Sequence, residues 1–158
     1  MNVLNSTTPG MTGISHELDE PGFAMVEDLC RKAFGFRLFT ILANDPGAGE
    51  ICRVYSSNPA DYPPGGRKPM GRTPWGEGVL RRGRAWLGDG EDALRWAFPD
   101  AALILSLGCE ACACAPVRQG DRVIGVLSLC DVRGSYAAED LNGLGALAQL
   151  LVAPLGQL

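Results

Sequence analysis

The sequence predicts an α+β fold in which five or six antiparallel strands form a central sheet and the terminal helices pack on one of its faces. Three observations lead to this prediction. Helical periodicity occurs near both ends of the chain, and short apolar runs separated by turn residues lie between them. In addition, residues 109–151 read as strand, tight glycine turn, strand and helix.

The composition is that of an ordinary globular chain. Of its 158 residues, 46% are hydrophobic and 20% are charged, which favours one domain with one core. We expect this domain over residues 19–158, after a polar, flexible segment at residues 1–18. The net charge of −4 provides no general attraction to nucleic acid or to an anionic membrane, so neither is expected as a partner.

The location of the protein is predicted from two features, the start of the chain and the length of its apolar runs. The start of the chain has neither the basic region nor the apolar region of a secretory signal. No apolar run is long enough to span a bilayer. We therefore expect a cytoplasmic protein whose six cysteines are reduced thiols.

The first predicted elements are a helix and a hairpin. The helix begins at Asp19, where acidic residues can cap it ahead of Pro21. One stripe of this helix is apolar and consists of Val26, Leu29, Cys30 and Ala33. Two strands follow at residues 38–43 and 51–56, and the Asn-Asp-Pro-Gly turn between them predicts antiparallel pairing.

The middle of the chain is irregular. Residues 57–83 contain five prolines and six glycines, and a loop of this length in a compact domain is usually functional or mobile. One short helix is expected near residues 78–82. Beyond it the pattern predicts a strand at residues 85–87, a helix at residues 89–96 and a further strand at residues 102–106.

The last predicted helix has apolar residues on more than one side. Ser135 is its expected cap, and its main stripe consists of Leu141, Leu144, Ala148, Leu151 and Leu155. Leu147 and Leu150 lie off that stripe. A helix of this kind is buried on two sides, so we expect one side to cover the sheet and the other to contact a second subunit of a homodimer.

Several motifs, in this order, resemble the GAF domain family. The motifs are the strand at residues 38–43, the Trp75–Val79 stretch before Arg84–Trp86, Ala115–Val117, Val123–Leu129 and Tyr136–Leu141. The resemblance covers roughly residues 20–155. It implies a GAF/PAS-like fold with an irregular roof over a small-molecule pocket on one face of the sheet. It also implies dimerisation through the terminal helices, and ligands ranging from cyclic nucleotides and tetrapyrroles to haem and amino acids.

The resemblance and the residue pattern together predict a non-enzymatic sensor that binds a small organic ligand. The expected ligand-binding residues are Tyr55, Arg67, Trp75, Trp86, Ser106, Cys109 and Glu110. Arg67 would pair with an anionic group of the ligand and Trp75 would cover an apolar part of it. No bound cofactor is identified by the sequence, and the signal is expected to pass through the dimer helices to a separate protein.

The cluster Cys109, Cys112 and Cys114 is the most conspicuous local motif. A structural zinc site requires four nitrogen or sulfur ligands, and Cys130 could be the fourth. If Gly120 and Asp121 form a two-residue turn, however, Cys112 lies opposite Leu129, and Cys130 points to the other face of the sheet. A register change of one residue would reverse this. We therefore expect no metal site, and cysteines that act as small core residues.

An enzymatic alternative comes from one branch of the GAF family, which reduces free methionine-R-sulfoxide with pocket cysteines. In this alternative Cys109 and Cys112 would be the nucleophilic and resolving thiols. The sequence departs from that branch at Leu80, where a cysteine is expected. Catalysis by a Ser-His-Asp or Cys-His arrangement is not predicted, because the only histidine, His16, lies in the flexible segment.

Overall fold

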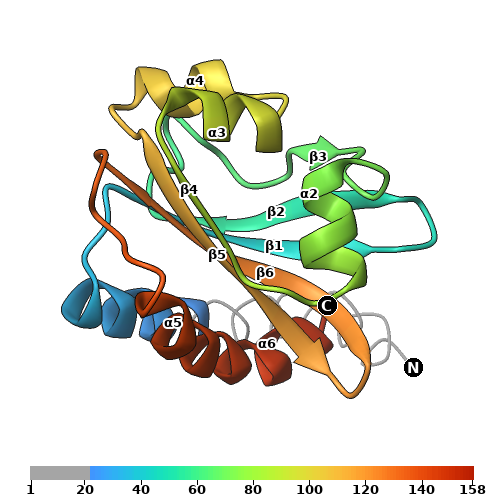
Figure 1. Ribbon diagram of the computed structural model, residues 1–158. Helices are drawn as coiled ribbons and strands as arrows, with labels where there is room; N and C mark the ends of the chain where they lie inside the picture. Colours follow the sequence, from blue (N-terminus) through green and yellow to red (C-terminus); the bar gives the residue numbers. More distant parts are fainter. Residues whose placement is uncertain (1–21) are drawn as a thin grey trace, which may run out of the picture.

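The computed structural model describes residues 22–158, and these residues form a six-stranded sheet with helices on both faces (Figure 1). The strand order is β3-β2-β1-β6-β5-β4, and every neighbouring pair is antiparallel. The strands are β1 (Leu38–Asp45), β2 (Glu50–Ser56), β3 (Arg67–Lys68), β4 (Trp86–Asp89), β5 (Ala111–Gln119) and β6 (Arg122–Asp131). The predicted α+β sheet is confirmed, whereas the predicted segment 1–18 lies outside the described residues.

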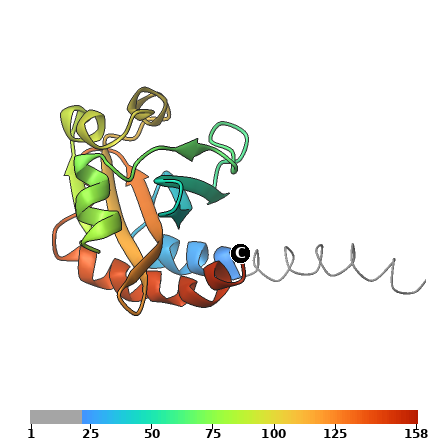
Figure 2. The same ribbon diagram turned by 90° about the vertical axis from the view of Figure 1, so that its right-hand side faces the viewer.

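The terminal helices cover one face of the sheet, as predicted (Figures 1 and 2). They are the helix at residues 22–33, α5 (Asp140–Ala148), the short η2 (Gln149–Leu151) and α6 (Val152–Gly156). Ser135 does not cap α5, since its hydroxyl donates to the carbonyl of Val132, and the helix begins five residues later. None of the helices described is both long and apolar enough to cross a membrane.

The other face is covered by what we call the roof, residues 57–66, 69–83 and 90–108. It contains α2 (Pro74–Gly76), η1 (Glu77–Arg81), α3 (Glu91–Ala97) and α4 (Ala101–Ser106). The predicted strand at residues 102–106 is wrong, because this segment is α4. A short apolar run is ambiguous between strand and helix. Here a tight turn after α3 sets the helix: the N–H groups of Leu103 and Ile104 donate to the carbonyl of Asp100.

Alternation along the strands divides the interior into two cores. Phe39 and Ile41 of β1 face the terminal helices and belong to a helix-side core, together with the alanines of β5 at positions 111, 113 and 115. Leu38 and Leu42 face the roof and belong to a roof-side core, together with Cys112 and Cys114. The small alanine side chains let α5 approach β5 closely, while the thiols occupy the opposite face.

Two irregularities in the sheet change the side to which particular residues point. One lies in the β1–β2 pair between Ile41 and Leu42, and the other lies in the β5–β6 pair between Val117 and Arg118. The predicted two-residue turn is present, since Gln119 pairs with Arg122. The second bulge then shifts the register by one residue, so that Cys112 pairs with Cys130 rather than with Leu129. The predicted register is therefore wrong.

Candidate functional site

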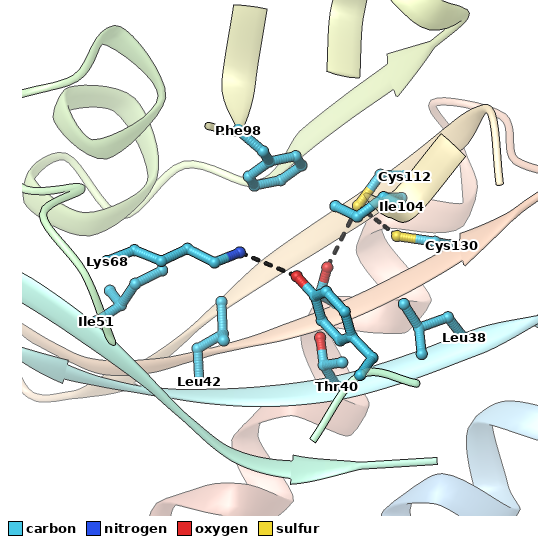
Figure 3. A pocket seen from close by; sticks show the side chains of 11 residues that line it. Leu38, Thr40, Leu42, Ile51, Lys68, Phe98, Ile104, Cys112 and Cys130 are labelled. Atoms are coloured by element: carbon cyan, nitrogen blue, oxygen red, sulfur yellow. Dashed lines mark hydrogen bonds between the residues drawn. The ribbon is translucent and has the colours of Figure 1, made fainter. Parts of the chain in front are cut away.

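A small cavity lies between the roof and the middle of the sheet. Leu38, Thr40 and Leu42 of β1 contribute to its floor, and Phe98 and Ile104 of the roof cover it (Figure 3). Lys68 reaches in from one side, and Cys112 and Cys130 lie on the other (Figure 3). The cavity has a volume of about 20 Å³, which is room for one water molecule.

A buried ionic network lies along one side of this cavity, and two of its members, Lys68 and Tyr62, line it. The ammonium group of Lys68 lies 2.5 Å from Oδ2 of Asp100, and it donates to the hydroxyl oxygen of Tyr62 over 2.9 Å. The Tyr62 hydroxyl in turn donates to Oδ2 of Asp100 over 2.7 Å. Nη2 of Arg53 lies 3.5 Å from the same oxygen, and the guanidinium group stacks 3.4 Å from the centre of the Tyr62 ring.

The network joins four separate segments of the chain. Arg53 comes from β2, Lys68 from β3, Tyr62 from the loop between them and Asp100 from the corner between α3 and α4. Nη1 of Arg53 also donates to the carbonyl of Pro63 over 2.6 Å. The network therefore ties the roof to the sheet beside the cavity.

The network is not fully satisfied. Within the described part of the chain, three buried side-chain polar atoms have no hydrogen-bond partner, and these are Nε of Arg53, Oδ1 of Asp100 and Nε1 of Trp75. Two of the three belong to the network. An unpaired buried polar atom costs about 1–3 kcal/mol, and a group that serves packing alone is normally paired. We therefore regard this wall as the candidate binding site.

The environment sets the protonation of the network. Burial lowers the pKa of Lys68, while the neighbouring Asp100 carboxylate opposes that shift. Burial raises the pKa of Tyr62 far above its usual value, and the charge of Asp100 adds to this effect. Tyr62 is therefore a neutral donor at physiological pH, and it can hold a carboxylate without a charge of its own.

The opposite wall of the cavity carries the thiols. Sγ of Cys112 lies 3.1 Å from Sγ of Cys130 and 3.7 Å from Sγ of Cys114, and the Ser128 hydroxyl is 3.3 Å from Cys112. Burial raises the pKa of Cys114 well above its usual value. The pKa of Cys112 is raised as well: Cys114 acts to lower it, but the hydrogen bond from Cys130 and burial outweigh that effect. Neutral thiols of this kind are poor nucleophiles.

All six cysteines lie within the described residues and are free thiols. Among residues 22–158, no group of three or more His, Cys, Asp or Glu side chains is arranged to hold a metal ion. The thiol wall is a polarisable surface of the cavity.

Of the residues predicted from the sequence, only Cys112 lines the cavity. Trp75 is buried in the roof-side core and packs 5.4 Å from Phe98 between ring centres. Trp86 stacks on Trp96 at 6.1 Å. Cys109 is fully buried in the same core.

Four other predicted residues lie away from the cavity. Arg67 is exposed and lies within ion-pair distance of Asp45 and Glu50, and Ser106 and Glu110 are exposed. Tyr55 packs against aromatic rings of the helix-side core, and its hydroxyl donates to Oε1 of Glu27.

The predicted set of ligand-binding residues contains none of Arg53, Tyr62, Lys68 and Asp100. One signal was available. Arg53 lies two residues after Ile51 in a strand, so alternation places a charged side chain on the same buried face as an isoleucine. Asp100 carried no comparable signal, because its role depends on a corner between two helices.

A larger, open groove of about 590 Å³ lies beside the β1–β2 turn. It is lined by residues of that turn and by Gly71, Arg72, Leu80 and Arg81. Leu80 is the only fully buried side chain in its wall, and the two arginines are not buried. The groove therefore lacks the enclosed polar groups that fix a small ligand.

Several solved structures resemble this fold. A free methionine-R-sulfoxide reductase from Neisseria meningitidis, solved with its substrate, is 22% identical, with a TM-score of 0.62 over 82% of this chain and 73% of that chain. A GAF domain of a Bacillus halodurans sensor histidine kinase is 13% identical, with a TM-score of 0.70 over 87% and 92%. A GAF/HD domain protein from Geobacter sulfurreducens is 13% identical, with a TM-score of 0.72 over 90% and 94%.

At these identities the likeness shows the fold alone. No curated protein matches the chain. The model of the GAF domain, however, matches residues 16–153, which is most of the chain. The order of strands, the roofed cavity and this match agree with one another, and the chain therefore belongs to the GAF domain family.

Proposed function

We propose that this GAF domain is a non-enzymatic sensor that binds a small organic molecule in the cavity between the sheet and the roof. The observation that carries the proposal is the buried Lys68–Asp100–Arg53–Tyr62 network, which lies against the cavity and keeps two buried polar atoms unpaired. Two members of the network, Lys68 and Tyr62, line the cavity, and a few polar groups in a largely apolar space are typical of ligand sites.

The signal would arise from the opening of the cavity. With room for about one water molecule, it must widen before it can hold an organic ligand. Because the network ties the roof to β2 and β3, widening requires the network to rearrange. A ligand that binds only the rearranged form shifts the population toward it.

We also propose that the domain works as a cytoplasmic homodimer that passes its signal to a separate protein. Support comes from apolar side chains that remain exposed on the terminal helices: Met25 is 51% exposed, Leu29 36% and Leu150 45%. A second subunit would cover these side chains, and a change in the sheet would reach it through α5, which packs on β5.

The first test is native mass spectrometry of the freshly purified, reduced protein. A dimer with a discrete additional mass is expected, and that mass would identify the ligand. The matched variant Lys68→Met should lose the additional mass and stay dimeric, since Lys68 lies on the roof side of the sheet. If the wild type carries the ligand and Lys68→Met binds it equally well, the proposed site is contradicted.

The second candidate function is a cysteine-dependent reductase of the free methionine-R-sulfoxide type. It is favoured by Cys112, whose thiol lines the cavity 3.1 Å from that of Cys130, and by the likeness to the Neisseria enzyme. In such a reaction two thiols become a disulfide while the sulfoxide oxygen leaves as water. An external thiol would then have to reduce the disulfide.

The two candidates are separated by replacing cysteines. The variants Cys109→Ser and Cys112→Ser should abolish turnover of methionine-R-sulfoxide if the protein is a reductase, and should leave ligand binding within a few-fold if it is a sensor. Two facts weigh against the reductase. The thiol of Cys112 is held neutral by its surroundings, and burial raises the pKa of Cys109 to about 11.

A further inference from the structure

The charges of the buried network are unequal. Two cations, Arg53 and Lys68, face a single carboxylate, that of Asp100, and no other acidic side chain in the described part of the chain pairs with either. The side chains of Arg53 and Lys68 are only 7% and 12% exposed. Burying an uncompensated charge is costly, so the site has the capacity for a second negative charge.

Only one of the two carboxylate oxygens of Asp100 has partners. Its Oδ2 receives Lys68 and Tyr62 and lies near Arg53, while its Oδ1 is buried without a partner. Nε of Arg53 is likewise unpaired. The donors are therefore suited to a carboxylate, but the position of Asp100 does not use all of them.

Asp100 is also the member of the network that can leave. Its side chain is 24% exposed, about twice the fraction of Lys68. It lies at the corner between α3 and α4, outside the sheet, and it is not among the residues that line the cavity. Turned outward, its carboxylate would regain water, whereas the two cations would remain buried.

Lys68, by contrast, belongs to the ionic network and also lines the cavity. Its ammonium group contacts Asp100 and also lines the cavity (Figure 3). A carboxylate that entered the cavity would meet Lys68 and the Tyr62 hydroxyl first. The apolar part of the same molecule would lie against Leu42 and Ile104.

We infer that Asp100 is an internal substitute for the carboxylate of the ligand. In the free protein it pairs with Lys68 and Arg53 and ties the roof to the sheet. A small organic carboxylate displaces it, and the α3–α4 corner moves outward with the displaced side chain. This inference rests on the proposed function, and it adds the chemical class of the ligand and the means by which binding opens the roof.

The test uses sodium acetate as the probe, with sodium chloride at equal ionic strength as the reference. Affinity is measured from amide chemical shifts of the full-length protein. In Asp100→Asn the competing charge is gone, and acetate should bind at least about tenfold more tightly than to the wild type. Asp121→Asn, which removes an exposed carboxylate from the β5–β6 turn, should leave the affinity unchanged. The double variant Asp100→Asn/Lys68→Met should lose the gain.

An unchanged or weaker affinity for acetate in Asp100→Asn would overturn the inference. Inorganic phosphate that binds this variant while acetate does not would overturn the carboxylate class. If the variant does not fold, the wild type serves: saturating acetate should shift the amides of both Asp100 and Lys68. A shift at Lys68 alone, or at neither, would overturn displacement. A native ligand without a carboxylate would refute the inference and leave the proposed function standing.

Discussion

Cys112 lies directly opposite Cys130 in the β5–β6 pair, and their sulfur atoms are 3.1 Å apart on the wall of the cavity. A two-residue turn alone would have placed Leu129 opposite Cys112. The bulge between Val117 and Arg118 moves the pairing by one residue. It therefore gathers Cys112, Cys114 and Cys130 on the face that the roof covers, where their thiols are shielded from solvent.

The first prediction concerns thiol reactivity. Cys52 is the only cysteine of the six that is not fully buried, so a disulfide reagent should modify about one thiol rapidly in the native protein. The other five should react only as the protein opens, because burial blocks access and keeps these thiols neutral. The number of modified thiols is followed over time from the absorbance of the chromophore that the reagent releases. Cys52→Ser should remove the rapid phase, whereas rapid modification of Cys112 would show that the roof opens readily.

The second prediction concerns alkaline pH. Burial raises the pKa of Cys30 to about 12 and that of Cys109 to about 11 from 9.0. In this range the unfolded chain releases protons that the folded state keeps. Stability is therefore fully present below pH 9 and is lost as the pH rises toward 11 or 12, by about 1.4 kcal/mol per pH unit for each thiol.

Urea denaturation at pH 8, 9 and 10 measures how the free energy of unfolding falls with pH. Cys109→Ala should reduce this slope by the contribution of one thiol. The lowered pKa of Lys68 acts in the opposite sense, because its burial is less costly once it is neutral. The comparison of wild type with Cys109→Ala cancels that contribution. An identical slope in both proteins would contradict the prediction.

The third prediction concerns two glycines, Gly76 at the end of α2 and Gly78 in η1. A Cβ at Gly76 would lie 1.8 Å from the carbonyl oxygen of Met70, which is backbone and cannot move aside cheaply. Gly76→Ala should therefore lower the free energy of unfolding by at least about 2 kcal/mol. Gly78 is the matched control, because nothing lies within 4 Å of a Cβ there. Gly78→Ala should be neutral or stabilising by up to about 1 kcal/mol. Thermal unfolding of both variants checks this, and equal losses would contradict it.

The fourth prediction separates the two faces of the sheet. Tyr55→Phe removes a hydrogen bond to Glu27 on the helix side and should cost about 1–2 kcal/mol of stability. It should leave the affinity for ligand unchanged. Tyr62→Phe removes a donor to Asp100 and should change that affinity. Denaturation and binding curves measured on the same samples test the contrast, and a ligand effect of Tyr55→Phe would refute our placement of the site.

Much of the fold could be predicted because it depends on local patterns. Three local patterns each specify their element without distant contacts: the continuous apolar run Leu38–Ala43, the turn at Gly120 and Asp121 and the apolar stripe of the last helix. The buried residues Leu144, Ala148, Leu151 and Leu155 confirm most of that stripe. Residues 102–106 were assigned wrongly because a short apolar run carries no period long enough to distinguish a helix from a strand.

The site could be predicted only in part, and the two bulges explain much of the difference. Alternation alone places Tyr55 on the same face as Arg53. The irregularity in the β1–β2 pair matches Leu42 with Arg53 and Ile41 with Tyr55, so Tyr55 lies on the helix side. Asp100 and Lys68 are 32 residues apart in the sequence, and only the folded roof brings them together.

The bulge in the β5–β6 pair has a consequence for how such a domain can change over generations. Its extra residue is Ile124 of β6, because Val117 pairs with Gly125 and Arg118 pairs with Val123. Deletion of Ile124 would restore the simple hairpin and leave Cys112 opposite Cys130, because the pairs on both sides of the bulge would keep their partners. If the chain kept Ile124 without the bulge, Leu129 would take the place of Cys130 opposite Cys112, and the three thiols would no longer share one face. The bulge thus lets the hairpin gain or lose one codon beside its turn without a change in the chemistry of the pocket wall.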